Sequence, residues 1–184
     1  MHYTPEQVWH PAQPFFTHKI PNALRSWLSD RGSLTQRLIS RCENFQVTVF
    51  DEYWAKPNRS ELELLQLSNN KLCFIREVHL FCGEEPAVFA RTVIPQNTLR
   101  GELQKLTQLG AQPLGAVLFA NNNIRRGIIQ TSCTNKQHEI YHQALCYSHF
   151  YDKQVWGRRS PFYLGNKPLL VSEYFLPVIE KFSL

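Results

Sequence analysis

Two pairs of strand-like segments, each joined by a short turn, constrain the fold of this chain most. Residues 72–82 and 87–94 are apolar and rich in β-branched and aromatic side chains, and only G-E-E-P separates them. Residues 158–164 and 169–176 form a second pair around G-N-K. Connections this short join antiparallel neighbours, because a parallel crossover is much longer. The sequence therefore predicts an antiparallel sheet.

Two further regions predict a helix, a tight turn and a second helix. Residues 22–30 have helical spacing, and we expect Gly32 to end this helix in the left-handed conformation. Ser33, with Gln36 three residues later, predicts the N-cap of a helix that begins at Leu34.

The same arrangement recurs later, with a helix at 102–109, a capping Gly110, and Pro113 where a first helical turn favours proline. We also expect strands at 45–53 and 124–131, a short helix or loop at 60–67, a polar helix at about 134–152 and an irregular arm at 1–19. Helices grouped on an antiparallel sheet define an α+β fold.

The composition fits one domain over residues 1–184 and argues against a nucleic-acid or membrane protein. Hydrophobic residues make up 43% of the chain and the formal net charge is +5, but Lys and Arg are scattered rather than clustered. No segment approaches the roughly 18 consecutive apolar residues of a membrane span, and we see no signal peptide. We expect a cytoplasmic protein, and a monomer, because no long edge or heptad seam is evident.

The cysteines predict free thiols. There are five, at positions 42, 73, 82, 133 and 146, and their odd number and irregular spacing do not suggest a disulfide framework. Reduced thiols are typical of a cytosolic protein.

Arginines interrupt the apolar rows of the first strand pair. Arg76 shares a strand face with Val78. An even-numbered turn would place Val78 opposite Arg91, so that Arg91 joins Arg76 on one face. Buried charges are costly unless paired, so this arrangement favours a site for an anionic ligand. The alternative, surface charges in weak ion pairs, stays open.

One carboxylate raises the same question in the last strand. Glu173 lies in a row with Leu169, Val171 and Phe175. A two-residue loop before this strand would place Glu173 opposite Arg158, and a three-residue loop opposite Arg159. Helix starts at Leu34 and Leu114 would add backbone N–H groups suited to an anion, although ordinary caps can also satisfy these groups.

Several motifs together resemble the chorismate lyases, the chorismate pyruvate-lyases of ubiquinone synthesis. They occur in the family's order: W-L-S-D-R-G-S-L-T-Q-R-L (27–38), I-R-E-V-H-L (75–80), A-R-T-V-I-P (90–95), L-G-A-Q-P-L-G-A-V-L-F (109–119), W-G-R-R-S (156–160) and K-P-L-L-V-S-E-Y-F-L-P (167–177). They cover most of residues 20 to 178, and the last two together are the most specific.

The resemblance implies a sheet of about six antiparallel strands, with a buried pocket under two helix-turn-helix flaps. It implies conversion of chorismate to 4-hydroxybenzoate and pyruvate without metal or cofactor. Arg76 and the N–H groups of Leu34 and Leu114 would hold the ring carboxylate, and Glu173 would meet the ring hydroxyl. We add Arg91 as a candidate for the enolpyruvyl carboxylate, because we expect it on the face of Arg76.

The segment 131–155 departs from the family as an apparent insertion, and it contains H-E-I-Y-H at 138–142. This matches the H-E-x-x-H pattern of zinc hydrolases, but the motif is short and a zinc protease embeds it in a larger, differently organised domain, so we expect a surface helix here and no metal site. A second alternative is non-enzymatic: small-molecule sensing domains of bacterial transcription regulators are similar in fold.

Overall fold

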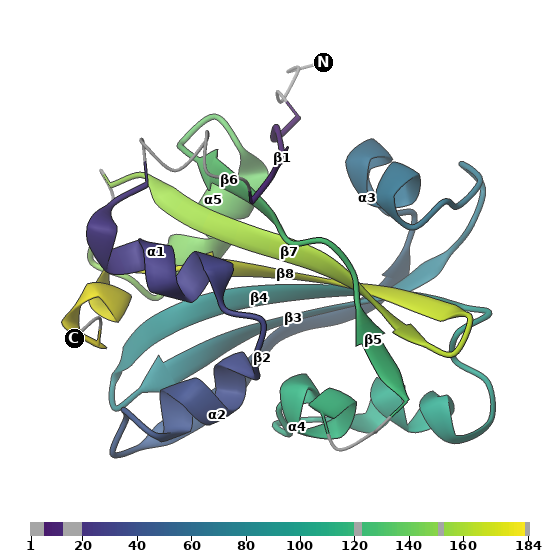
Figure 1. Cartoon of the computed structure of the whole chain (residues 1–184), viewed down its shortest axis with the longest axis horizontal. Coiled ribbons are helices and arrows are strands. Elements are labelled where there is room, and N and C mark those ends of the chain that lie inside the picture. The colour runs from purple at the N-terminus through teal and green to yellow at the C-terminus, as the bar shows by residue number, and fades with distance from the viewer. Residues whose placement is uncertain (1–5, 13–19, 120–122, 151–152, 183–184) are drawn as a thin grey trace.

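The computed structural model describes residues 6–12, 20–119, 123–150 and 153–182. The strands are β1 (His10–Pro11), β2 (Phe45–Ala55), β3 (Cys73–Cys82), β4 (Glu85–Pro95), β5 (Ile124–Arg126), β6 (Gln130–Thr134), β7 (Val155–Leu164) and β8 (Lys167–Phe175). They form one antiparallel sheet in the order β1-β6-β7-β8-β4-β3-β2, with β5 also paired to β7 (Figure 1). The predicted antiparallel α+β class is confirmed.

Within the described residues, the sheet has eight strands rather than about six. Two of these are short additions, because residues 10–11 of the expected arm pair with β6 and the expected strand at 124–131 divides into β5 and β6. Gly127 lies at the division, where its N–H donates to the carbonyl of Pro161 at 2.8 Å. A Cβ at Gly127 would lie 2.7 Å from the Pro161 ring, so this close crossing requires glycine.

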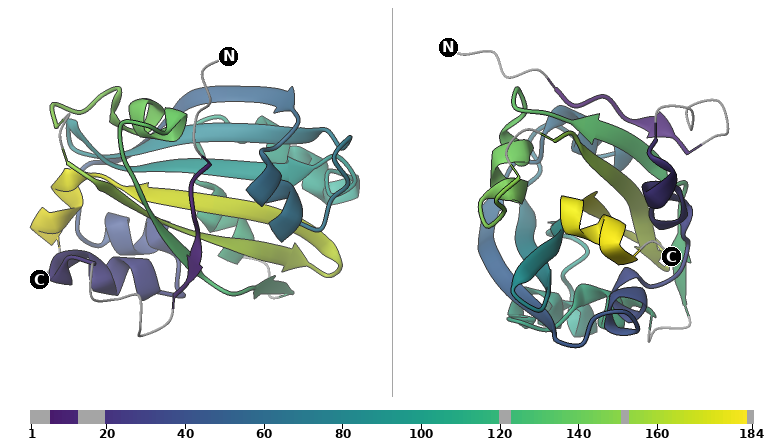
Figure 2. Two further views of the ribbon diagram at one scale, coloured as in Figure 1. Left: turned by 90° about the horizontal axis from the view of Figure 1, so that it is seen from above. Right: turned by 90° about the vertical axis from the view of Figure 1, so that its left-hand side faces the viewer.

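The helices are α1 (Asn22–Ser29), α2 (Leu34–Ile39), α3 (Arg59–Leu64), α4 (Leu114–Phe119) and α5 (Glu139–Leu145), with 3₁₀ turns η2 (Gly101–Gln108) and η3 (Pro177–Phe182). Figures 1 and 2 show a strongly curved sheet, with α2 and α4 on one side and α3 and α5 on the other. Apolar side chains of α1, α2 and η3 pack in one core cluster, and those of η2 and α4 in a second. The first cluster includes Val78 and Leu80 and the second includes Phe74, all from one face of β3. On the other face of the sheet, α5 packs with Phe89 of β4 and Tyr174 of β8.

The predicted caps are partly confirmed. Ser33 caps α2 by accepting a hydrogen bond from the N–H of Gln36 at 3.3 Å, and Gly110 has a left-handed φ of 52°. Gly32 is not left-handed, so that prediction is wrong: α1 ends where Asp30 becomes extended, and the Asp30 carboxylate accepts the N–H of Gly32 at 2.8 Å.

The regions with ambiguous patterns are shorter or more regular than expected. The segment 60–67 overlaps the helix α3, which begins at Arg59 and which Asn58 and Glu61 start with a capping box. Of the predicted helix 134–152, only α5 is helical, because residues 130–134 complete strand β6, and residues 151–152 lie outside the described part.

The register of β3 against β4 differs from the prediction by one residue. The turn is even-numbered, since Cys82 pairs with Glu85, but a bulge follows: Phe81 pairs with Pro86 and Leu80 with Val88. One extra residue on one strand reverses the face of every later side chain relative to its partner. Arg91 is therefore opposite Glu77, and its predicted position on the face of Arg76 is wrong.

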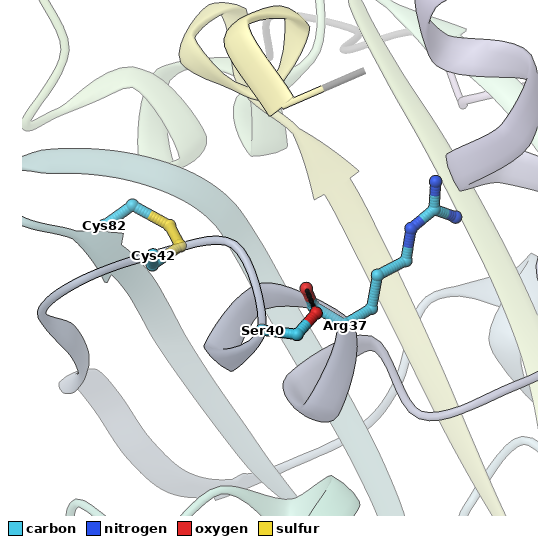
Figure 3. Close-up of a disulfide and its surroundings, with 4 residues drawn as sticks. All are labelled: Arg37, Ser40, Cys42 and Cys82. Atoms are coloured by element: carbon cyan, nitrogen blue, oxygen red, sulfur yellow. Dashed lines mark hydrogen bonds between the residues drawn. A yellow bond between two sulfur atoms is a disulfide. The ribbon is translucent and has the colours of Figure 1, made fainter. Parts of the chain in front are cut away.

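The prediction of free thiols is wrong for two cysteines. Cys42, just after α2, forms a disulfide with Cys82 at the end of β3, with a Cα–Cα distance of 5.2 Å (Figure 3). These residues are 40 positions apart in the chain and meet because β2 returns antiparallel to β3, with Phe45 paired to Cys82. Cys73, Cys133 and Cys146 are free.

No helix in the described ranges is both long enough and apolar enough to cross a membrane.

Candidate functional site

A small cavity of about 50 Å³ lies beneath α2 and α4, on the sheet face that carries Arg76. Its lining includes Leu34, Arg76, Leu114, Phe162 and Glu173. Four elements distant in sequence supply the predicted group: β3 supplies Arg76, β8 supplies Glu173, and α2 and α4 begin with Leu34 and Leu114. The structure thus brings together four of the five predicted site residues.

Arg76 is buried at one side of this cavity, with a side chain 2% exposed. Its Nε donates to Glu52 Oε1 at 2.9 Å, across the β2–β3 pair. Its Nη2 donates to the carbonyls of Gly110 and Gln112, at 2.6 and 3.2 Å, in the turn that precedes α4. Burial lowers the pKa of Arg76 and the neighbouring Glu52 carboxylate opposes this. This one guanidinium therefore links the sheet to the second flap, which consists of η2, α4 and the turn between them.

Glu173 lies at another part of the cavity and is paired with Arg158. The β7–β8 loop has two residues, so Arg158 is directly opposite Glu173, and its Nε donates to Glu173 Oε2 at 2.5 Å. The Nη1 of Arg158 donates to the carbonyls of Trp27 and Asp30, each at 2.6 Å, in the first flap. This pair explains why a carboxylate is tolerated in an apolar strand row.

Arg126 of β5 is a second arginine beside Glu173, and the sequence analysis did not select it. Its Nη2 lies 3.8 Å from Glu173 Oε2, and its side chain is 8% exposed. Burial, with Arg158 next in importance, lowers the pKa of Arg126 to about 10. The only sequence signal was its place in the Arg125-Arg126 pair, which does not specify a neighbour.

The two flap helices place their first residues at the cavity. Leu34 and Leu114 are each the first residue of a helix, where backbone N–H groups have no acceptor inside the helix. The helices contact each other: a Cβ on Gly115 would lie 2.9 Å from Thr35 Oγ1. Glycine at 115 thus permits the close approach of the two flaps over the cavity.

Arg91 is not part of this cavity. It lies on the opposite face, where its Nε and Nη2 donate to the two carboxylate oxygens of Glu61 at 2.8 and 3.2 Å. Its Nη1 donates to Glu77 at 2.6 Å and to the Tyr53 hydroxyl at 3.0 Å. Burial alone would lower the pKa of Arg91, but Glu61 and Glu77 raise it above its ordinary value. Arg91 belongs to a buried ion network that joins α3 to the sheet.

Comparison with known proteins gives a family match over nearly the whole chain. The family model for chorismate lyase matches residues 5–183. The chain belongs to the chorismate lyase family. A protein of Aromatoleum aromaticum named "probable chorismate pyruvate-lyase" is 40% identical over 163 residues, which cover 88% of each chain. A protein of Nitrosomonas europaea with the same name is 36% identical over 181 residues, covering 98% of this chain and 99% of the relative.

Solved structures similar to this chorismate lyase family member show the fold alone. A GntR-family transcriptional regulator from Bacillus cereus has a TM-score of 0.55 at 9% identity, and covers 72% of this chain and 92% of that one. The C-terminal domain of a histidine utilization repressor from Pseudomonas syringae has a TM-score of 0.55 at 6% identity, over 73% and 92% of the chains.

The H-E-I-Y-H segment of this family member does not form a histidine pair on one helix face. His138 precedes α5 as its N-cap residue, and its Nδ1 accepts the N–H of Asn135 at 3.4 Å. The Nε2 of His142 lies 2.9 Å from the carbonyl of Lys136. Within the described ranges, no three His, Cys, Asp or Glu side chains cluster in a way that could hold a metal ion.

Proposed function

We propose that this lyase eliminates pyruvate from chorismate to give 4-hydroxybenzoate. The observation that carries the proposal is the cavity in which buried Arg76 and Glu173 face a common space beneath two flap helices. Chorismate has a ring carboxylate, a ring hydroxyl and an enolpyruvyl ether. A cation and a carboxylate on either side of an apolar space match the first two groups.

The carboxylate of the ring is assigned to Arg76 and to the N–H groups of Leu34 and Leu114. A guanidinium and backbone donors both favour a carboxylate, and burial strengthens their interaction with it. Because Glu52 already neutralises Arg76, the backbone donors are needed to favour the added negative charge.

The ring hydroxyl is assigned to Glu173, with two possible roles. In the first, Glu173 helps to remove the C4 proton; the electrons of that C–H bond form the new ring double bond, and the C3–O bond breaks with its electrons going to the enolpyruvyl oxygen. The enolpyruvate that leaves takes up one proton at its methylene carbon and becomes pyruvate. In the second, the hydrogen passes internally to the enolpyruvyl methylene, and Glu173 only orients the ring. Both routes make the ring aromatic, so the chemistry as proposed needs no metal or cofactor, and the protein supplies orientation and charge.

The size of the cavity implies that the flaps open during turnover. On the scale where one water needs about 10–15 Å³, the cavity of about 50 Å³ holds only a few waters. A substrate with a six-membered ring therefore enters only if the walls move. We expect slow product release and inhibition by 4-hydroxybenzoate; rates that do not change with added product would contradict this.

The deciding experiment is turnover of chorismate in the presence of a chelator. We expect an aromatic product by absorbance and an equal amount of pyruvate in a coupled lactate dehydrogenase assay. Binding without turnover would instead favour the sensing role suggested by the similar fold of transcription regulators. Activity that the chelator abolishes would favour metal-dependent chemistry.

The two roles of Glu173 are separated by the Glu173→Gln variant. A small fall in kcat with a changed affinity for 4-hydroxybenzoate would exclude the base role. A large fall in kcat with intact product binding would support it. Circular dichroism and the thermal midpoint of the variant are needed as controls, because the change leaves Arg158 without its charge partner.

We also propose that the protein is a cytoplasmic monomer of one domain and that its product enters ubiquinone synthesis, as the family resemblance suggests. Light scattering during size-exclusion chromatography tests the monomer, and complementation of a quinone-deficient strain tests the fate of the product.

A further inference from the structure

Arg126 is buried beside Glu173 with a guanidinium that is incompletely paired. Its Nε donates to the hydroxyl of Ser160 at 2.8 Å. Its Nη1 reaches the carbonyls of Asp30 and Gly32 at 3.3 and 3.4 Å, and its Nη2 is 3.8 Å from Glu173 Oε2. The last three distances exceed those of good N–H···O bonds. Arg126 can therefore exchange these contacts for stronger ones at little cost.

The charges around Glu173 do not balance. Arg158 and Arg126 share this one carboxylate, and the three side chains are 1%, 8% and 12% exposed. Arg158 makes the short bond to Glu173, which leaves the charge of Arg126 weakly compensated. The lowered pKa of Arg126 agrees with this, because burial, Arg158 and Arg31 disfavour its charged form more than Glu173 and Asp30 favour it. An added anion would relieve the imbalance.

The other part of the cavity has no such excess, since Glu52 pairs with Arg76. Chorismate carries two carboxylates, and the proposed function uses only that of the ring. The enolpyruvyl ether is on the ring carbon next to the one bearing the hydroxyl, so the second carboxylate lies near Glu173. Arg91, our first candidate for this group, lies on the opposite face of the sheet.

We infer that Arg126 binds the enolpyruvyl carboxylate of chorismate and so selects a dianionic substrate. The inference rests on the proposed function. Substrate binding exchanges the long contacts of Arg126 with the Asp30 and Gly32 carbonyls for a charge-assisted pair. When pyruvate leaves, Arg126 returns to these carbonyls.

The space needed for this exchange lies where the first flap moves. Arg126 is not among the residues that line the cavity, but its guanidinium carbon lies 5.0 Å from the centre of the ring of Phe162, which does line it. The carbonyls that hold Nη1 belong to the turn between α1 and α2. Movement of that turn would therefore widen the cavity and free Arg126 together.

The test compares two probes that need no turnover: 4-hydroxybenzoate, with one carboxylate, and 3-(carboxymethoxy)-4-hydroxybenzoate, with a second carboxylate on an ether next to the hydroxyl. Their dissociation constants are measured by calorimetry for the wild type and for Arg126→Gln. We expect the variant to bind the dianion roughly 10- to 100-fold more weakly, as expected for a buried charge pair that loses one partner, and to bind the monoanion within about threefold of wild type. The KM for chorismate should rise in parallel with the dianion constant.

Arg125→Gln is the matched control, because Arg125 is the preceding residue of β5, is exposed and lies over the Tyr163 ring at 4.2 Å. It should leave both constants unchanged. Equal losses of both probes in Arg126→Gln would indicate a structural role and overturn the inference, and so would an unchanged ratio of the two constants. If Arg126→Gln does not fold, Arg126→Lys decides: it loses the bidentate geometry, and a ratio equal to that of wild type overturns the inference. A wild type that binds the probes with the expected preference but does not convert chorismate would refute the proposed function and not this assignment.

Discussion

Replacing Arg76 with alanine removes a buried cation and three hydrogen bonds, to Glu52, Gly110 and Gln112. Hydrogen bonds to charged groups contribute about 1.5–3 kcal/mol each. Gly110 and Gln112 are exposed, and the Glu52 side chain is 26% exposed, so water replaces part of what is lost. We therefore expect the free energy of unfolding to fall by about 2–4 kcal/mol rather than by the full sum.

The same variant should lose affinity for 4-hydroxybenzoate. Removing the buried charge partner of the product's carboxylate should cost about 2–4 kcal/mol of binding free energy, which is roughly a 30- to 800-fold rise in Kd. Urea unfolding followed by tryptophan fluorescence measures the loss of stability, and calorimetry without urea measures the loss of product affinity. The KM for chorismate should rise as well.

Two matched variants make this result interpretable. Arg59→Ala removes an exposed arginine of α3 whose ion pair with Glu63 is on the surface, and should change stability by less than about 1 kcal/mol. Glu52→Gln removes the charge partner of Arg76 but keeps the cation, and should retain or improve product affinity. A folded Arg76→Ala variant with unchanged KM and product affinity would refute the reasoning.

Three further predictions concern parts of the fold outside the cavity. Arg91→Ala should lower the free energy of unfolding by about 3–5 kcal/mol, because it leaves Glu61 and Glu77 buried without a cation. At temperatures below the unfolding transition, kcat/KM of this variant should stay near the wild-type value. A large loss of kcat/KM would instead indicate that Arg91 contributes to the active site. Reduction of the Cys42–Cys82 bridge, which closes a loop of 40 residues, should lower the free energy of unfolding by about 3–4 kcal/mol. Thermal melts with and without reductant measure this difference, which the control variant Cys133→Ser should leave unchanged. An unfolding midpoint that does not change on reduction would contradict the bridge. Burial lowers the pKa of His79 below its ordinary 6.5, so the unfolded chain takes up a proton at a higher pH than the folded chain does. The free energy of unfolding should therefore fall as the pH drops below about 6.5, by at most about 1.4 kcal/mol per pH unit. Urea titrations from pH 5 to 8 should show this slope in the wild type and a smaller slope in His79→Gln.

Local patterns predicted those features of the site that depend on neighbouring residues. Ser33 and Gln36 specify the start of α2, and Gly110 specifies the turn before α4, because capping and left-handed backbone are chosen within a few residues. The apolar row around Glu173 suggested Arg158 or Arg159 as its partner, and the two-residue loop of the structure decides for Arg158. The motifs that resemble the chorismate lyases then selected Leu34, Arg76, Leu114 and Glu173 from many possible polar groups.

By itself, the sequence determined the α+β class and the hairpins, because strand alternation and capping are encoded over short stretches; the four residues that line one cavity were implied by the resemblance to the chorismate lyases. Only the tertiary structure decided which face Arg91 occupies, since a single bulged residue in β4 reverses it and no local pattern marks the bulge. It likewise decided that Cys42 meets Cys82 and that Arg126 lies beside Glu173. The last two contacts join residues far apart in the chain, and they exist only once the strands that carry or flank them have paired.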